Sequence, residues 1–165
     1  MLTHAHEDHL GAVADLWPRL KAPVYATPFA ASVLRRKLTQ AGLVDAVRIT
    51  DIPLRGKFRL GPLDLEMVTM THSILEPNGL AIRTKFGTVF HTGDWKIDPE
   101  PLLGELTDEA LLKRIGDEGV LAMVCDSTNV FVEGEAGSEA MVLANLRELL
   151  KGRTQKLESA LMAIA

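Results

Sequence analysis

His4-Ala5-His6-Glu7-Asp8-His9 places three histidines and a carboxylate within six positions near the start of the chain. In a loop that joins a strand to a helix, neighbouring residues turn alternate side chains into one cavity. We therefore expect His4 and His6 to face one metal position, and Asp8 and His9 to reach a second one about 3.5–4 Å away. Imidazole and carboxylate together favour zinc or another borderline first-row ion. The alternative is a histidine-rich surface loop or a tag remnant, which further ligand candidates downstream argue against.

Those candidates follow predicted strands. Thr71-His72-Ser73 comes after one strand, and His91-Thr92-Gly93-Asp94 comes at the end of another. Gly93 permits a tight turn that aims Asp94 into the same cavity. Taken alone, His72 is typical of a core histidine with satisfied hydrogen bonds. The presence of the first histidine cluster favours its interpretation as a metal ligand. We expect His91, which lies inside its strand, to have a structural or supporting role.

Short helical and extended segments alternate along the chain. We expect helices at 10–17, 28–40, 108–115 and 138–150, with Pro18 ending the first and Thr27 capping the second. Strands are expected at 24–26 and 47–52, and β-rich hairpins at 57–70 and 80–91. The aliphatic run from Val120 to Cys125 predicts a buried strand. This interleaving predicts an α/β fold, layered in the α+β manner, with helices 28–40 and 138–150 covering the sheets.

The composition excludes several classes of protein. The chain has 165 residues, of which 47% are hydrophobic and 24% charged, with a net charge of −4 and one cysteine, Cys125. These values exclude a disordered tail, a fibrous protein and a disulfide scaffold. No apolar run approaches the length of a membrane span and no secretory signal opens the chain, so we expect a cytoplasmic protein that contacts no membrane. The basic run Arg35-Arg36-Lys37 is expected to be a solvated helix face rather than an RNA contact.

The motifs taken together resemble a known family. His-x-His-x-Asp-His, Thr71-His72-Ser73 and the phrase from His91 to Lys96 are similar to the metallo-β-lactamase fold. Within that fold, Gly93-Asp94-Trp95-Lys96 and Asp126-Ser127-Thr128-Asn129 resemble the β-CASP nucleases, most closely the bacterial ribonuclease J family. The resemblance implies a partial αββα sandwich in a metallo-β-lactamase domain over residues 1–130, followed by the start of a β-CASP domain over 131–153.

The resemblance also implies a set of functional residues. His4, His6 and His72 would hold one zinc ion, Asp8 and His9 a second, and Asp94 would bridge the two. The implied reaction is hydrolysis of RNA phosphodiester bonds, by internal cleavage or from the 5′ end, with Asp8 and Asp94 as catalytic residues. The residues implied to contact the substrate are Lys96, Asp126 and Ser127. From the residues alone, Lys96 is instead typical of a solvated lysine and Asp126 of a helix cap or turn former.

Two features depart from the family pattern. The family supplies a further histidine ligand, whereas the five histidines here are His4, His6, His9, His72 and His91. The strands that normally precede the first motif are also missing, because Met1 lies three residues before His4. We therefore expect a piece of a longer enzyme, with little nuclease activity by itself and an exposed apolar sheet edge. RNA is the expected partner of the full-length protein, which the resemblance also allows to be a homo-oligomer.

The last residues, 154–165, are rich in helix formers where the family pattern predicts a buried strand. We attribute this atypical tail to an interrupted reading frame near Arg153, the alternative being divergence into a terminal helix.

Two other functions remain open for the chain. One is hydrolysis of a small ester, thioester or lactam, which the motifs at 93–96 and 126–129 argue against. The other is a non-catalytic, truncated product that binds zinc.

Overall fold

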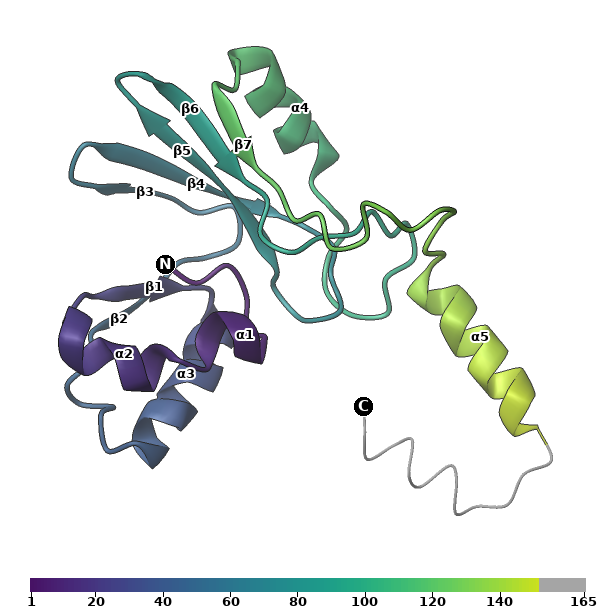
Figure 1. Cartoon of the computed structure of the whole chain (residues 1–165), viewed down its shortest axis with the longest axis horizontal. Coiled ribbons are helices and arrows are strands. Elements are labelled where there is room, and N and C mark those ends of the chain that lie inside the picture. The colour runs from purple at the N-terminus through teal and green to yellow at the C-terminus, as the bar shows by residue number, and fades with distance from the viewer. Residues whose placement is uncertain (152–165) are drawn as a thin grey trace.

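The computed structural model describes residues 1–151, so the atypical tail predicted at 154–165 lies outside the described residues. Helices and strands interleave as predicted (Figure 1). In chain order they are α1 (Glu7–Leu10), α2 (Val13–Leu20), β1 (Val24–Ala26), α3 (Pro28–Gln40), β2 (Ile49–Asp51), β3 (Lys57–Leu60), β4 (Leu63–Thr69), β5 (Asn78–Thr84), β6 (Gly87–His91), α4 (Glu109–Glu118), β7 (Ala122–Val124) and α5 (Glu139–Leu150). None of the helices within residues 1–151 is long and apolar enough to cross a membrane.

The strands form two sheets. β1 and β2 pair in parallel, and β3 to β7 form a second sheet in chain order. Neighbouring strands of the second sheet are antiparallel except for β6 and β7, which run parallel. The two predicted hairpins are confirmed as β3–β4 and β5–β6. The turn of the second hairpin consists of Lys85 and Phe86, because Thr84 already pairs with Gly87.

Alternation along β4 creates the layers of the fold. Leu65 and Met67 point to the side that meets the smaller sheet, where Tyr25 of β1 stacks on Phe58 of β3 with ring centroids 5.6 Å apart. Val68 lies on the opposite face and packs under Ile115 of α4. With α3 packed on β1 and β2, the order of layers is α3, small sheet, large sheet, α4. The predicted α/β fold and partial αββα sandwich are therefore confirmed.

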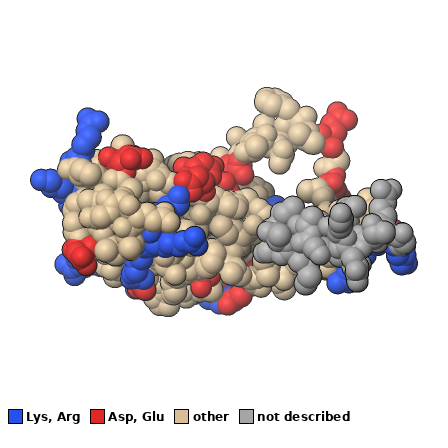
Figure 2. Space-filling model, turned by 90° about the horizontal axis from the view of Figure 1, so that it is seen from below, with Lys and Arg blue, Asp and Glu red and all other residues tan. Residues whose placement is uncertain are grey.

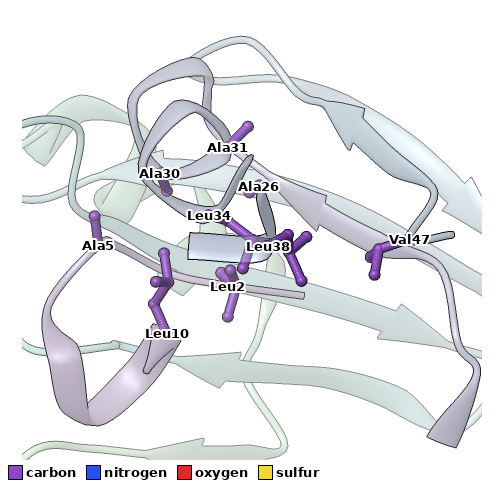
Figure 3. Close-up of a cluster of buried hydrophobic side chains, with 9 residues drawn as sticks. All are labelled: Leu2, Ala5, Leu10, Ala26, Ala30, Ala31, Leu34, Leu38 and Val47. Atoms are coloured by element: carbon purple, nitrogen blue, oxygen red, sulfur yellow. The ribbon is translucent and has the colours of Figure 1, made fainter. Parts of the chain in front are cut away.

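A hydrophobic cluster around α3 holds the N-terminal segment in place. Leu34 and Leu38 lie one helical turn apart on α3 and are fully buried. Figure 3 shows them converging with Leu2 of the N-terminal segment and Leu10 of α1. Since Leu10 is the last residue of α1 and has no exposed surface, its burial fixes the short helix that carries Asp8 and His9.

A charge cluster around one buried carboxylate joins α4 to the large sheet. The Glu66 carboxylate in β4 lies 3.0 Å from the Lys57 ammonium, 2.7 Å from the Arg83 guanidinium and 2.5 Å from that of Arg114 on α4. Burial opposes ionisation of Glu66, but hydrogen bonds from Lys57 and Arg83 outweigh it and hold the pKa of this carboxyl below its ordinary value. Because the buried Glu66 carboxylate is compensated by cations from both the sheet and α4, the cluster favours a single docking position for α4.

One expectation about helix ends is wrong, and another is confirmed in position but not in its contact. Pro18 lies inside α2 instead of ending it, because proline in the last turn removes only its own N–H donor and the helix closes three residues later. Lys21 closes it in the left-handed conformation and donates its N–H to Trp17 O at 2.7 Å. Thr27 occupies the N-cap of α3 as predicted, but its side chain makes no capping hydrogen bond.

Two expectations about burial are also wrong. The run from Val120 to Cys125 forms a strand only over β7, and all three residues of β7 are exposed. β7 is an edge strand, and α4 covers β4, β5 and β6 instead. α5 projects from the sheets in Figure 1 and contributes no buried residue, so the helix predicted at 138–150 is present but covers neither sheet. α4 takes the covering role on the large sheet.

Candidate metal centre

Four imidazoles and one carboxylate meet where the two sheets adjoin. His4 and His6 lie in the segment before α1, His9 lies in α1, and His72 lies in the loop between β4 and β5. Asp94 follows β6. The structure thus brings together five of the six predicted metal ligands from three separate segments, as the sequence motifs lead us to expect.

Main-chain hydrogen bonds place these segments. Leu2 N–H donates to Tyr25 O of β1 at 2.9 Å, and Asn78 N–H of β5 donates to Thr3 O at 3.1 Å. The two residues before His4 therefore link the small sheet to the large one. Because this link immediately precedes the first histidine, it delivers the motif to the junction of the layers.

Gly93 aims Asp94 at the cluster. Its φ of +62° is in the left-handed region, and a Cβ at this position would lie 2.8 Å from Asn78 O, so only glycine fits. His91 supports the same turn, because its Nδ1 accepts a hydrogen bond from Gly93 N–H at 2.9 Å. This is a structural contact of the kind predicted for His91.

The nitrogen atoms of the cluster face one another at short range. His6 Nδ1 lies 3.1 Å from His4 Nε2 and 3.1 Å from His72 Nε2. Asp94 Oδ2 lies 3.2 Å from His9 Nε2 and 3.9 Å from the Nε2 atoms of both His4 and His72. One carboxylate oxygen therefore borders three imidazoles, as expected of a residue that bridges two positions.

This arrangement fits a zinc site. Zinc binds histidine nitrogen at 2.0–2.1 Å in tetrahedral geometry, which requires ligand nitrogens about 3.3 Å apart. The observed 3.1 Å separations are close to that value. Two groups have all their donor atoms within 4.8 Å of one another: His4 with His6 and His72, and His4 with His9 and Asp94. Asp8 belongs to neither of these groups; its exposed carboxylate lies 3.5 Å from His9 Nε2 at the rim.

The protonation state of the cluster also suits a metal. His4 has no exposed surface, and burial together with the nearby His9 lowers its pKa from 6.5 to about 4. Burial likewise lowers the pKa of His72. Both imidazoles are therefore neutral at pH 7, which is the form that binds metal ions.

Thr3 is a supporting residue that the sequence motif did not reveal. Its hydroxyl lies 3.1 Å from His4 Nδ1. When Nδ1 donates to that hydroxyl, Nε2 keeps its lone pair directed at His6 and Asp94. In the sequence, the only indication of this contact is that a residue with a hydroxyl group precedes the first histidine.

The residues predicted to contact substrate have different surroundings. The Lys96 side chain is 31% exposed, and its ammonium lies 2.8 Å from the buried carboxylate of Asp98. Asp126 forms a turn in which its Oδ1 accepts from the N–H and the hydroxyl of Thr128, and these bonds lower the pKa of Asp126. The Asp126 N–H donates to the Thr92 hydroxyl at 3.1 Å, two residues before Asp94. Ser127 is exposed.

The basic run on α3 is largely neutralised by neighbouring carboxylates. Arg35 pairs with Asp51 at 2.5 Å, and Lys37 pairs with Glu7 at 2.6 Å. Figure 2 shows side chains of both charge signs scattered over one face of the molecule. The arrangement agrees with the prediction of a solvated helix face.

Known proteins share both the sequence and the fold. The profile described as "Beta-lactamase superfamily domain" matches residues 1–117. The chain is 51% identical over 150 residues to the Ribonuclease J of Sinorhizobium meliloti, an alignment that covers 91% of this chain and 27% of that protein. It is 37% identical over 152 residues to the Ribonuclease J of Helicobacter pylori, covering 92% of this chain and 22% of that protein. The chain thus spans about a quarter of the length of these relatives.

A solved structure supports the fold. The crystal structure of a protein of unknown function from Enterococcus faecalis superimposes with a TM-score of 0.65 at 18% sequence identity. The match covers 90% of this chain and 37% of that one. At this level of identity, the likeness shows that the layered arrangement of sheets and helices is shared.

Proposed function

The chain belongs to the beta-lactamase superfamily domain family, and on that premise we propose that its histidine cluster is the metal centre of a zinc-dependent ribonuclease of the ribonuclease J type. The observation that carries the proposal is the position of His6 Nδ1, which lies 3.1 Å from an imidazole nitrogen on either side. His6 and His72 are 66 positions apart in the sequence. Convergence of imidazole nitrogens from distant segments is the arrangement that a metal ion requires.

The proposed ligands divide between two positions. His4, His6 and His72 hold one zinc ion, while Asp8 and His9 hold the second. Asp94 lies between them, which its short distances to three histidines support. Zinc in such a site lowers the pKa of bound water from 15.7 toward about 7 and supplies positive charge where phosphate accumulates negative charge.

The side chains of the protein have distinct tasks in this scheme. His4 presents a neutral nitrogen at pH 7 and so has no proton to lose on binding metal. Asp94 contributes a fixed negative charge between the two positions. Asp8 lies at the exposed rim, 3.5 Å from His9, where its carboxylate accepts a proton from the attacking water and orients it.

RNA is the proposed substrate because of the sequence relationship. Two relatives named Ribonuclease J match about nine-tenths of this chain. The Asp126 turn, which resembles a β-CASP motif, is joined to the segment of Asp94 by the hydrogen bond from Asp126 N–H to the Thr92 hydroxyl. We propose that RNA is cut by the full-length protein to which this sequence corresponds, and that the 165-residue chain alone cuts RNA weakly or not at all.

The metal assignment is tested by elemental analysis. The chain and its His6→Ala and Asp94→Ala variants are dialysed against excess zinc and then against buffer. We expect bound zinc in the parent chain and a loss of zinc in both variants. Asp117→Ala, which removes an exposed carboxylate on α4, is the matched control and should retain the parental zinc content. Full zinc retention in His6→Ala and Asp94→Ala would refute the ligand set.

The substrate assignment is tested in a chimera. The segment of the Sinorhizobium meliloti relative that matches this chain over 150 residues is replaced by the corresponding residues of this chain. We expect zinc-dependent cleavage of single-stranded RNA, and none when the chimera carries His6→Ala. The same preparations are offered a thioester and a lactone. A folded, zinc-loaded chimera that hydrolyses these esters and leaves RNA intact would favour the small-substrate hydrolase instead.

A further inference from the structure

The loop that carries His72 is held at its base and along its side. It spans residues 70–77 between β4 and β5, and Met70 N–H closes it by donating to Pro77 O at 3.0 Å. Ile74, in the middle of the loop, packs against the hydrophobic cluster around α3. The position of His72 therefore depends on contacts between this loop and the opposite layer of the fold.

The N-terminus of α3 supplies the second contact. The first N–H groups of a helix lack partners within the helix and carry partial positive charge. The Thr27 hydroxyl, at the N-cap, is buried and has no hydrogen-bond partner among residues 1–151. Glu76 takes over this role: its Oε2 accepts from Phe29 N–H at 2.8 Å. A carboxylate from the His72 loop therefore caps a thirteen-residue helix in the other layer.

The backbone at Glu76 is constrained as well. Its φ of +55° lies in the left-handed region, which a residue with a Cβ rarely adopts. Asn78 secures this conformation, because its Nδ2 donates to Glu76 O at 2.6 Å. Asn78 N–H also donates to Thr3 O, directly beside His4. The same residue thus fixes the loop of one ligand and the segment of another, and strain of this kind persists where surrounding contacts determine the conformation.

We propose that Glu76 is a positioning residue for the metal centre: by capping α3, its carboxylate holds His72 at the correct distance from His6. The inference rests on the proposed function, because it concerns the same site. His4 and His6 are two positions apart in one segment, so their separation is locally determined. His72 arrives from a different layer and has no such constraint. The Glu76–Phe29 hydrogen bond and the contact of Ile74 with the hydrophobic cluster constrain the position of His72 instead.

The test measures metal affinity and coordination in the 165-residue chain. Glu76→Gln keeps an amide oxygen that accepts from Phe29 N–H, Glu76→Ala removes the acceptor, and Glu76→Gly removes it while relieving the strain at positive φ. Zn²⁺ affinity is measured by competition with a chromophoric chelator, and the visible absorption spectrum of the Co²⁺ form reports coordination geometry. We expect about a tenfold loss of Zn²⁺ affinity in the alanine and glycine variants, with a changed Co²⁺ spectrum. The glutamine variant should retain most of the affinity and the parental spectrum.

The control removes a helix cap elsewhere. Ser138→Ala deletes the hydroxyl that accepts from Met141 N–H at the start of α5, and its metal affinity and Co²⁺ spectrum should equal those of the parent. A glycine variant that folds and binds Zn²⁺ within twofold of the parent, with an unchanged spectrum, would refute the inference while leaving the metal centre intact. Absence of Zn²⁺ binding by the parent chain itself would instead refute the proposed function, and the inference with it.

Discussion

Mild acid should destabilise the metal-free chain, because His4 is buried as a neutral imidazole. Burial lowers the pKa of His4 from 6.5 to about 4. In the unfolded chain the same side chain keeps its ordinary pKa, so at pH 5 the unfolded state binds a proton that the folded state does not. The free energy of unfolding therefore falls as the pH decreases from 6.5 to 4. Linkage gives a loss of about 2 kcal/mol at pH 5 and about 3 kcal/mol at pH 4. The lowered pKa of His72 acts in the same direction.

Urea unfolding in the presence of a chelator, followed by circular dichroism at pH 7 and at pH 5, measures this loss. Carboxyls such as Asp98 and Asp108, whose pKa values lie below their ordinary value in the folded chain, stabilise it above pH 4 and lose that effect only at lower pH. The interval from pH 7 to pH 5 therefore reports the histidines together with the Met1 amino group, whose pKa is lowered by burial, and the His4→Gln variant separates the contribution of His4. His4→Gln removes the titrating group, and its loss over the same interval should be smaller by most of the 2 kcal/mol. Equal stabilities of the parent chain at the two pH values, or an undiminished loss in His4→Gln, would refute the reasoning.

Three further outcomes are expected. Thr3→Val, which removes the hydroxyl beside His4 Nδ1, should weaken Zn²⁺ binding about tenfold in chelator competition, and parental affinity would show that this hydroxyl does not orient the ligand. Zn²⁺ at one hundred times its dissociation constant should raise the free energy of unfolding by about 2.7 kcal/mol, whereas an equal gain in His6→Ala would place the ion elsewhere. Ile115→Ala, at a residue only 2% exposed, should lose about 2–5 kcal/mol in urea unfolding, against less than about 0.5 kcal/mol for the exposed Ile97→Ala; similar losses would contradict the assigned core.

Local patterns predicted the parts of the structure that depend on local physics. Alternation of apolar and polar residues gave both hairpins, and the spacing of His4, His6 and His9 placed three imidazoles on one short segment. The downstream motifs containing His72 and Asp94 also reach the cluster. Their use as metal ligands remains a prediction, but their convergence could be anticipated because strand ends present side chains at one edge of a sheet.

Long-range polar contacts could not be predicted in this way. Glu76 and Phe29 are 47 positions apart, and nothing in the sequence around either residue indicates their hydrogen bond. The pairing of Lys96 with buried Asp98 is equally hidden, because sequence alone does not show which carboxylate becomes buried. Such pairs arise only after packing has brought the segments together.

Apolar patterns predicted the presence of strands and helices better than they predicted which of them are buried. The run around β7 and the apolar residues of α5 have the composition of buried elements, yet Met123 is 63% exposed and Leu149 is 69% exposed. Hydrophobicity indicates that covering an apolar surface lowers the free energy of the protein in water. It does not indicate which segment provides the cover, so the prediction of burial is wrong for β7 and for α5.

The metal centre depends on the packing of the two layers, because its ligands are not equally constrained. The separation of His4 and His6 is set within one short segment, whereas the equal separation of His6 and His72, 3.1 Å, spans the junction between layers. A slide of one sheet against the other changes the second distance and leaves the first unchanged. Ile74 and Glu76 oppose such a slide, one by an apolar contact and the other by a helix cap. The geometry of the three-histidine group is therefore a sensitive measure of the sheet packing, and any substitution that loosens the junction should act first on His72.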